Sequence, residues 1–304
     1  MLANFIQQHN LSEDFAVSAN QYYLPLIHNL AAKCAGHDKN NQSAPLFVGL
    51  NGCQGSGKST LVEFLALYLT KQHKLSVTVL SLDDFYLNKE KRQQLARKIH
   101  PLFKTRGVPA THDVALLKDV LQQLKDVNST SSKHKLISLP RFDKRQDNPL
   151  ATPCWPEISD KIDIVLFEGW CWGVRAQMPQ ALDLAVNDFE KTLDPSAIWR
   201  RHINQSLQND YQPLYSLFDT WIMLKAPNFH VVYQWCLEQE QKLATACLAN
   251  HCMTKGIMSA TQVNEFVQHF QRLTECALEE LPASVDILFE LDSNRKIIAS
   301  RGLG

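Results

Sequence analysis

One stretch constrains the fold of this chain more than any other: residues 48–64 read VGLNGCQGSGKSTLVEF. Four residues separate Gly52 from the run Gly57-Lys58-Ser59, which gives the spacing G-x-x-x-x-G-K-S. Glycines placed in this way let the backbone wrap closely around an anion, while successive N–H groups and the start of the following helix donate to phosphate. The lysine of such a loop reaches the terminal phosphates and its serine ligates Mg²⁺. The spacing therefore predicts an ATP-Mg²⁺ site formed by Gly52, Cys53, Gln54, Gly55, Ser56, Gly57, Lys58, Ser59 and Thr60.

The surroundings of this loop favour a phosphate-binding loop over the alternative, a glycine-rich turn that matches by chance. The run PLFVGL before it is a short apolar segment typical of a buried strand. The run KSTLVEFLALYLTKQ after it has helical spacing, and LSVTVLSL is the next strand-like segment. Strand, glycine loop, helix and strand together form a βαβ unit, which is the context that phosphate binding requires.

The rest of the chain continues the alternation of strands and helices. Further strand-like segments are expected at 134–140, 161–170 and 217–226, with one more strand and an edge hairpin over 284–301. Helical patterns are expected over 112–126, 197–208, 229–249 and 260–280. This order predicts an α/β fold of the P-loop NTPase type, in which a mostly parallel sheet lies between two layers of helices.

The first part of the chain has a different character. Apolar residues at helical spacing run from Phe5 to Leu30, and a polar stretch, HDKNNQSAP, follows at 37–45. We therefore expect an N-terminal helical extension over 1–43 and a P-loop kinase domain with acceptor-binding insertions and a lid over 44–304.

Composition excludes several classes of protein. Lys plus Arg equals Asp plus Glu at 31 each, so no overall charge favours nucleic acid or an anionic membrane. No segment approaches the roughly 18 uninterrupted apolar residues of a membrane span, and the N-terminus does not resemble a signal peptide. The eight cysteines show no C-x-x-C spacing, and the cluster Cys247, His251 and Cys252 lacks a fourth zinc ligand. We therefore expect a soluble, cytoplasmic protein with reduced thiols, whose oligomeric state the pattern does not set.

Among nucleotide-binding proteins, a small-molecule kinase fits best. A guanine switch needs an N-K-x-D segment, whereas the nearest string, NKEK at 88–91, ends in lysine. A large ATPase motor normally needs more chain and a partner. A small-molecule kinase needs only an acceptor pocket and a base.

Two acidic positions suit a kinase. Asp83 and Asp84 follow the second strand in SLDDFY, and Glu168 follows another strand in VLFEGW. Ligands of a parallel sheet gather beyond the carboxyl ends of its strands, so these acids are expected to meet the P-loop at one edge. The alternatives are a helix cap or turn for the two aspartates and an ordinary surface acid for Glu168. Function is favoured for Asp83 and Glu168, and for Asp84 the two interpretations are even.

Four motifs now reveal a family resemblance: SLDDFY, RGVPATHD (106–113), LPRFDK (139–144) and VLFEGWCWG (165–173). Together with VYQWCLEQEQKL (232–243), they resemble the D-glycerate 3-kinase family and its bacterial kinase-like relatives. These proteins belong with uridine kinase, pantothenate kinase and phosphoribulokinase. The similarity spans roughly residues 46–295.

The resemblance implies transfer of the γ-phosphoryl group of ATP to a hydroxyl of a small acid, in the family's case D-glycerate. It implies Lys58 and Asp83 as catalytic residues, with Asp83 as the base, and Ser59, Asp83 and Glu168 as Mg²⁺ ligands. On the acceptor side it offers Arg106, His112, Asp113, Arg141 and Lys144, whose arginines suit an anionic acceptor. Helix capping by His112 and Asp113, and a solvated role for Lys144, are the competing interpretations.

The chain also departs from the family. After FDK it reads RQDNPLATP instead of a Gly-Arg-Gly-Asp-Arg-like segment, and Cys236 stands where relatives commonly have an arginine of the lid. Arg200 or Arg201 is our candidate for the missing cation. Two alternatives follow: a kinase for another hydroxylated metabolite, such as a nucleoside or a pantothenate-like acid, and an ATP-binding regulatory module without transfer activity.

Overall fold

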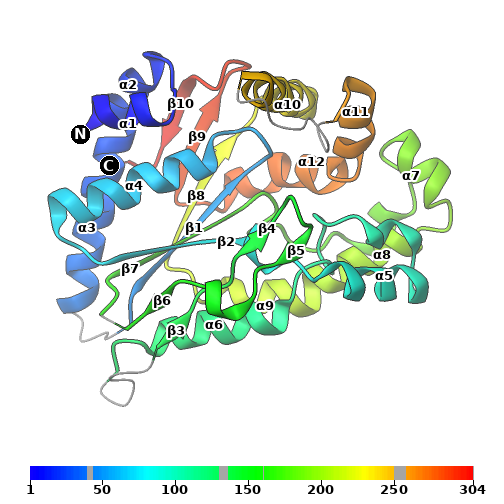
Figure 1. Cartoon of the computed structure of the whole chain (residues 1–304), viewed down its shortest axis with the longest axis horizontal. Helices are drawn as coiled ribbons and strands as arrows, with labels where there is room; N and C mark the ends of the chain where they lie inside the picture. The colour runs from blue at the N-terminus through cyan, green and yellow to red at the C-terminus, as the bar shows by residue number, and fades with distance from the viewer. Residues whose placement is uncertain (40–43, 130–135, 160, 250–257, 304) are drawn as a thin grey trace.

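The structure, a computed structural model, describes residues 1–39, 44–129, 136–159, 161–249 and 258–303. Its centre is a sheet with the strand order β10-β9-β8-β1-β7-β2 (Figure 1). All neighbouring strands are parallel except β9 and β10, which form the antiparallel edge hairpin expected from the sequence. The strands span Leu46–Gly52 (β1), Val77–Ser81 (β2), Ile164–Gly169 (β7), Thr220–Lys225 (β8), Ile287–Leu291 (β9) and Ile297–Arg301 (β10).

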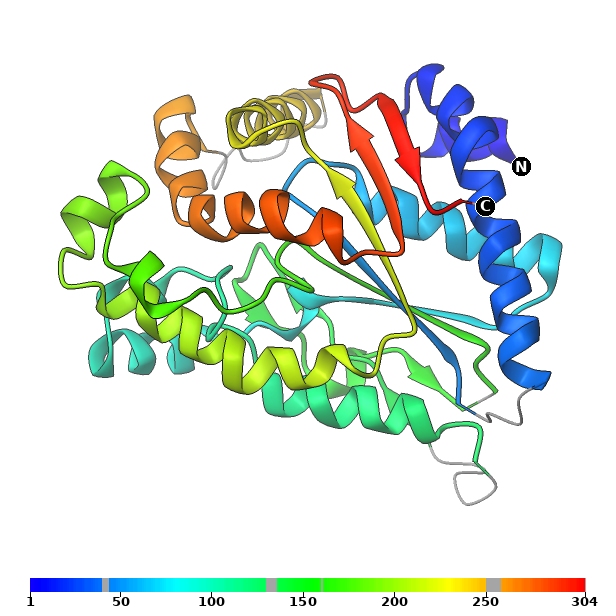
Figure 2. The same ribbon diagram turned by 180° about the vertical axis from the view of Figure 1, so that it is seen from behind.

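Helices cover both faces of this sheet. Successive strand residues face opposite ways, so Val48 and Leu166 pack in one core and Phe47 and Phe167 in the other. The first core includes α3 (Leu24–Lys39), α4 (Lys58–His73) and α10 (Phe229–Ala249), and the second includes α6 (Val114–Asp126), α8 (Ile198–Ser206) and α12 (Gln271–Glu280). Figures 1 and 2 show the two helical layers on opposite sides of the sheet. The predicted three-layer α/β/α fold is confirmed.

The N-terminal helices lie on the layer that contains α4. Helices α1 (Leu2–Gln8) and α2 (Asp14–Ser18) lead into α3, and Phe15 makes an edge contact with Phe64 of α4 at 5.4 Å between ring centroids. Tyr23 makes a similar contact with Phe289 of β9 at 5.9 Å. Helix α3 runs into the stretch that we interpret as a linker, whose residues 40–43 lie outside the described part. The division of the chain at residue 43 stays a prediction.

Three local expectations were incomplete. Of the segment expected at 134–140, residues 134 and 135 lie outside the described part, and residues 136–140 do not join the central sheet, because β3 (Ile137–Ser138) pairs antiparallel with β6 (Glu157–Ile158). The helix expected over 260–280 is two helices, α11 (Ala260–Gln268) and α12, separated at His269 and Phe270. The helix expected over 197–208 continues through a π-helical turn, Leu207–Tyr211, into α9 (Gln212–Tyr215), which contains Pro213.

The remaining elements surround the carboxyl ends of the strands. A second small hairpin, β4 (Phe142–Asp143) with β5 (Asn148–Pro149), lies beside α5 (Lys89–Lys98), and α7 (Asp188–Leu193) precedes α8. Among the described residues, no helix is both long and apolar enough to cross a membrane.

Candidate active site

The glycine loop joins β1 to α4 as its sequence predicts. Gly55 and Gly57 have φ values of +76° and +89°, a left-handed conformation that glycine adopts without strain. Helix α4 begins at Lys58, and Gly57 before it has no side chain to cap the first-turn N–H groups. The Ser56 hydroxyl is buried and finds no hydrogen-bond partner within the part of the chain that the structure describes. The loop thus presents backbone and side-chain donors that a phosphate would satisfy.

Glu168 connects this loop to the neighbouring strands. It lies at the end of β7, in register with Leu50 of β1 and Ser81 of β2. Its Oε1 accepts hydrogen bonds from the Ser59 hydroxyl at 3.1 Å and the Ser81 hydroxyl at 2.8 Å. The Lys58 ammonium lies 3.8 Å from Oε2, which is buried and has no hydrogen-bond partner among the described residues. A buried carboxylate oxygen beside a serine hydroxyl is a donor set that fits Mg²⁺.

Asp83 lies in the turn after β2, and two donors hold its carboxylate. The Tyr86 hydroxyl donates to Oδ1 at 2.8 Å, and the Lys144 ammonium contacts Oδ2 at 2.6 Å. Burial alone would raise the pKa of Asp83, but Lys144 and Lys58 outweigh burial and hold the pKa well below its usual range. Burial likewise opposes the charge on Lys58, and Glu168 and Asp83 overcome it, which leaves the Lys58 pKa raised. The expected meeting of P-loop, Asp83 and Glu168 is therefore present.

Asp84 anchors a hairpin. One of its carboxylate oxygens accepts from the Phe142 backbone N–H at 3.2 Å, and the other lies 3.4 Å from Arg141. These contacts hold the start of the β4–β5 hairpin against the turn that carries Asp83. Asp84 and Arg141 thus contact each other, and this contact positions the hairpin.

Arg106 lies on the other side of the same hairpin. Its guanidinium contacts Asp147 at 2.5 Å and lies over the Phe142 ring at 5.6 Å from the centroid. Phe142 in turn makes an edge contact with Tyr86, the donor to Asp83. A series of contacts therefore leads from Asp83 through the rings of Tyr86 and Phe142 to Arg106, and the Arg106 side chain remains 30% exposed.

The buried Arg92 fixes this arrangement, although no sequence pattern singled it out. It donates to the backbone carbonyls of Leu87, Lys104 and Asp147, and its side chain lies 2.6 Å from an Asp147 carboxylate oxygen. Asp147 thus joins Arg92 to Arg106. A charged residue in the middle of an exposed-looking helix, KEKRQQLARK, offers no signal that its side chain is buried.

His112 and Asp113 have different surroundings. His112 is buried and stacks on Tyr86 at 4.5 Å, and its Nδ1 forms a hydrogen bond with the Tyr211 hydroxyl at 2.6 Å. Burial lowers the pKa of His112 to about 3, so its ring is neutral. Asp113 caps α6 through the Leu116 N–H and pairs with Lys91 at 3.1 Å. Capping is therefore observed for Asp113 but not for His112.

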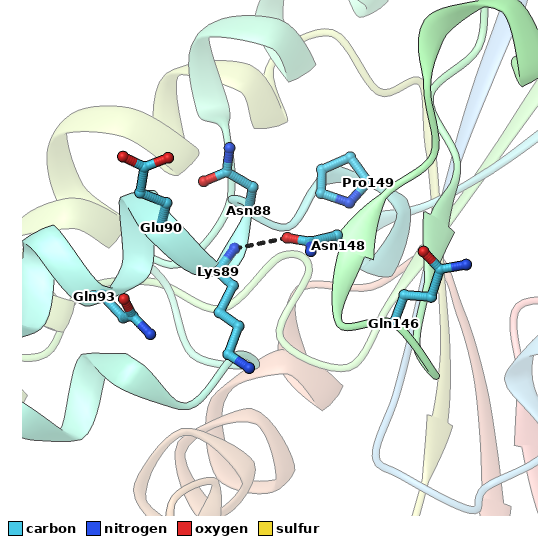
Figure 3. A pocket seen from close by; sticks show the side chains of 7 residues that line it. All are labelled: Asn88, Lys89, Glu90, Gln93, Gln146, Asn148 and Pro149. Carbon is cyan, nitrogen blue, oxygen red and sulfur yellow. Dashed lines mark hydrogen bonds between the residues drawn. The ribbon is translucent and has the colours of Figure 1, made fainter.

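An open, polar pocket of about 640 Å³ lies between α5 and the β4–β5 hairpin (Figure 3). In its wall the Asn148 side-chain oxygen accepts from the Lys89 backbone N–H at 3.0 Å. None of the predicted site residues lines it; the lining consists of Asn88, Lys89, Glu90, Gln93, Gln146, Asn148 and Pro149. The pocket thus borders the hairpin but contains none of the predicted chemistry.

The C-terminal edge hairpin forms part of the nucleotide side, which the sequence did not indicate. In its turn, Arg295 donates to the Gly55 carbonyl at 2.6 Å, pairs with Glu238 at 2.7 Å and lies over the Trp235 ring. A side chain at Gly55 would place its Cβ 2.6 Å from the Trp235 Cβ. Helix α10 and Arg295 therefore enclose one side of the P-loop.

The prediction that Arg200 supplies the missing lid cation is wrong. Its side chain is buried, where it donates to the Leu182 carbonyl and pairs with Asp194 at 3.0 Å. Arg201 is half exposed and contacts Asp183 at 2.5 Å. Both arginines therefore organise the segment before α8. Cys236 is buried, and burial raises the pKa of its thiol to about 11, so it carries no charge.

Two members of the candidate zinc cluster, His251 and Cys252, lie outside the described residues. Within the described ranges, no group of three or more His, Cys, Asp and Glu side chains is placed to hold a metal ion. Glu168 and Ser59 offer oxygens from only two residues, fewer than such a group needs. This suits Mg²⁺, which is commonly held partly by substrate phosphates.

Comparison with known proteins now places the chain. No protein-family model matches it. An uncharacterized kinase of Schizosaccharomyces pombe, mug58, is 32% identical over 237 residues, which cover 75% of this chain and 79% of the relative. The chloroplastic D-glycerate 3-kinase of Arabidopsis thaliana is 29% identical over 259 residues, or 82% of this chain and 52% of that protein. The chain belongs to the D-glycerate 3-kinase family of P-loop kinases.

A solved structure agrees with this family at the level of the fold. The D-glycerate 3-kinase of Cryptococcus neoformans superposes with a TM-score of 0.72 at 24% identity, covering 91% of this chain and 98% of that one. As a member of the D-glycerate 3-kinase family, the chain is an ATP-dependent phosphotransferase that acts on a hydroxyl group of a small molecule.

Proposed function

We propose that this kinase transfers the γ-phosphoryl group of ATP to a hydroxyl of D-glycerate. The observation that carries the proposal is the path from Asp83 to Arg106. The Asp83 carboxylate, which Lys144 and Lys58 hold in its charged form, lies near the P-loop lysine, and a guanidinium suited to a carboxylate lies beyond two aromatic rings. Arg binds carboxylates through parallel N–H donors, so Arg106 suits an acceptor that carries a carboxylate in addition to its hydroxyl.

In this proposal the P-loop and Lys58 hold the triphosphate, and Glu168 and Ser59 hold Mg²⁺. The metal neutralises charge on the phosphate oxygens when it is bound. Asp83 orients the acceptor hydroxyl and takes its proton as the oxygen bonds to the γ-phosphorus. The bond from that phosphorus to the bridging oxygen breaks at the same time, and its electron pair leaves with ADP. Because phosphoryl transfer is loose in character, orientation and charge stabilisation contribute more than proton removal.

Among the acceptor-side predictions, Arg106 is the residue proposed to bind the carboxylate. His112 supports Tyr86 by stacking, so we propose a packing contribution from its neutral ring. Asp113 is occupied by its cap and by Lys91. Arg141 holds the hairpin through Asp84.

The test is ADP release measured with a panel of acceptors. D-glycerate is compared with glycerol, which has the hydroxyls without the carboxylate, and with uridine and pantothenate. We expect D-glycerate to give the highest kcat/KM and glycerol to be poor, with ³¹P NMR identifying the phosphorylated hydroxyl. A higher kcat/KM for uridine or pantothenate would refute the choice of acceptor. ADP release that no acceptor stimulates would instead indicate a module without transfer activity.

The contribution of Arg106 is tested separately. Arg106→Gln should raise KM for D-glycerate by about tenfold or more while changing kcat much less, because a carboxylate contact is made before the chemical step. The neutral acceptor glycerol should be used almost as well by the variant as by the wild type. An equal loss with both acceptors would show that Arg106 does not bind the carboxylate.

A further inference from the structure

Lys144 is an exposed residue that reaches into the site. It lies in the turn between β4 and β5, and 59% of its side chain is exposed. Its ammonium nevertheless lies 2.6 Å from the Asp83 carboxylate. The next residue, Arg145, is 97% exposed, and its guanidinium lies 3.9 Å from the Asp143 carboxylate. The two cations of one turn therefore have different surroundings.

Contacts on both strands hold the β4–β5 hairpin, whereas the Lys144 side chain extends from it toward Asp83. Asp84 holds the Phe142 N–H and Arg141, and Asp147 is held by Arg92 and Arg106. Lys144 extends from this anchored frame on a flexible stem of four methylenes. Its ammonium can change partners by side-chain rotation, without movement of the hairpin.

The pair that Lys144 forms with Asp83 is accessible to water. Both side chains are partly exposed, and ion pairs of this kind contribute little net free energy because water competes for both charges. The γ-phosphoryl group of ATP carries more negative charge than one carboxylate and has several acceptor oxygens. An ammonium beside both groups therefore gains by moving to the phosphoryl oxygens.

The place of that phosphoryl group follows from Lys58. A P-loop lysine contacts the terminal phosphates, and Lys58 lies near enough to lower the pKa of Asp83 together with Lys144. Lys58 on α4 contacts Glu168 at 3.8 Å, and Lys144 on the β4–β5 hairpin contacts Asp83 at 2.6 Å, so each ammonium pairs with one of the two predicted site acids.

Two arginines on other elements are already engaged. Arg295 is bound to the Gly55 carbonyl and Glu238, and Arg200 is buried against Asp194. Position 236 on α10 is an uncharged cysteine. In the described ranges, Lys144 is the cation from outside the P-loop that contacts the Asp83 carboxylate.

We infer that Lys144 is a catalytic cation that leaves Asp83 when ATP binds and contacts the γ-phosphoryl group. The exchange has two effects. It places a second positive charge on the oxygens that gain charge in the transition state, and it frees Asp83 Oδ2 to take the hydroxyl proton. The inference rests on the phosphoryl transfer proposed above but not on which acceptor receives the group.

Nucleotide affinity tests the contact directly, without turnover. Isothermal titration with Mg²⁺ compares a non-hydrolysable ATP analogue with ADP in the wild type, Lys144→Met and Arg145→Met. We expect Lys144→Met to lower the preference for the ATP analogue over ADP about tenfold, because only the analogue has a γ-phosphoryl group. Arg145→Met removes a charge from the same turn and should keep the wild-type preference within about twofold.

Turnover supplies the second readout. With any acceptor that the wild type uses, kcat of Lys144→Met should fall about 100-fold, and Lys144→Arg should restore part of that loss. An unchanged preference between the two nucleotides in Lys144→Met would overturn the inference, even if kcat fell. Equal weakening of both nucleotides would overturn it too, since it indicates a general effect on the loop.

The outcome is separable from that of the proposed function. If the wild type fails to use D-glycerate, the acceptor assignment falls, whereas the nucleotide comparison needs no acceptor. If Lys144→Met melts at a lower temperature than Arg145→Met, the Lys144→Arg variant decides the matter. A loss of the nucleotide preference in that charge-retaining variant, equal to the loss in Lys144→Met, would refute a role for the charge.

Discussion

Replacing Asp83 by asparagine is the sharpest test of the catalytic geometry. The amide oxygen of the new side chain keeps the hydrogen bond from Tyr86, but the charge that holds Lys144 and the capacity to take a proton are lost. Loss of a general base reduces turnover by roughly 10²–10⁴-fold. At about 1.36 kcal/mol per factor of ten, this corresponds to about 2.7–5.4 kcal/mol of lost transition-state stabilisation.

Stability should change far less than turnover in this variant. The Lys144–Asp83 pair is partly exposed, so removing it should cost about 1 kcal/mol or less of unfolding free energy. The melting temperature of a chain this long should then fall by about 4 °C or less. A large loss of kcat in a protein that still melts normally would therefore reflect chemistry.

The assay is coupled ADP release at saturating acceptor, with ATP affinity measured by titration and folding by thermal melting. Asp84→Asn is the matched control, because the amide side chain keeps an oxygen for the Phe142 N–H and contacts no reacting group. We expect Asp84→Asn to retain more than a tenth of wild-type kcat. Turnover of Asp83→Asn within about threefold of wild type, or a parallel loss in both variants, would refute the assignment of Asp83 as the base.

Three further predictions concern the loop, the metal and the buried histidine. Gly55→Ala should abolish measurable ATP binding in titrations, because its Cβ would lie 2.6 Å from that of Trp235, whereas Gly36→Ala, with open space around it, should bind ATP normally. Glu168→Gln should raise the Mg²⁺ concentration needed for half-maximal rate by about tenfold or more, and an unchanged requirement would exclude Glu168 as a ligand. Because burial lowers the pKa of His112 from 6.5 to about 3, the unfolded chain binds a proton that the folded chain does not, and stability is lost as pH falls through this interval. Denaturant unfolding at several pH values should show this as about 1.4 kcal/mol per pH unit, and His112→Gln should remove it.

Local periodicity was sufficient to predict the central layers of the fold. Strand β1, the P-loop and α4 follow from one short stretch because each is specified by near neighbours: apolar runs, two left-handed glycines and helical spacing. The meeting of Asp83, Glu168 and Lys58 was also predictable, since the carboxyl ends of parallel strands share one edge. Chemistry placed by strand ends can therefore be predicted from the sequence.

Partners brought together by the order of strands could not be predicted in this way. Arg295 lies 240 residues from Gly55 along the chain, and its contact depends on the position of the edge hairpin beside α10. The 284–301 pattern predicted that hairpin, but nothing in its periodicity says which loop it will cover. Trp235 has the same difficulty, because a buried aromatic residue on a helix gives no sign of its partner.

The error over Arg200 has a different cause and shows what a charge pattern lacks. Two adjacent arginines in IWRRHIN suggest mobile surface cations, yet Arg200 points inward beside Asp194, and Glu190 lies 3.9 Å from it. Glu190 is itself held by Arg272 from α12 at 2.6 Å, so one buried acid joins two helices. Burying such charges is tolerated only when each has partners, and those partners lie in segments that the sequence alone does not bring together.

Lys144 is the opposite case: its charge looks solvated in sequence and is largely exposed in the structure, yet the anchored hairpin brings it to Asp83. Whether a cation is available to a substrate thus depends on how weakly its resting partner holds it, and by that measure Lys144 is available and Arg200 is not.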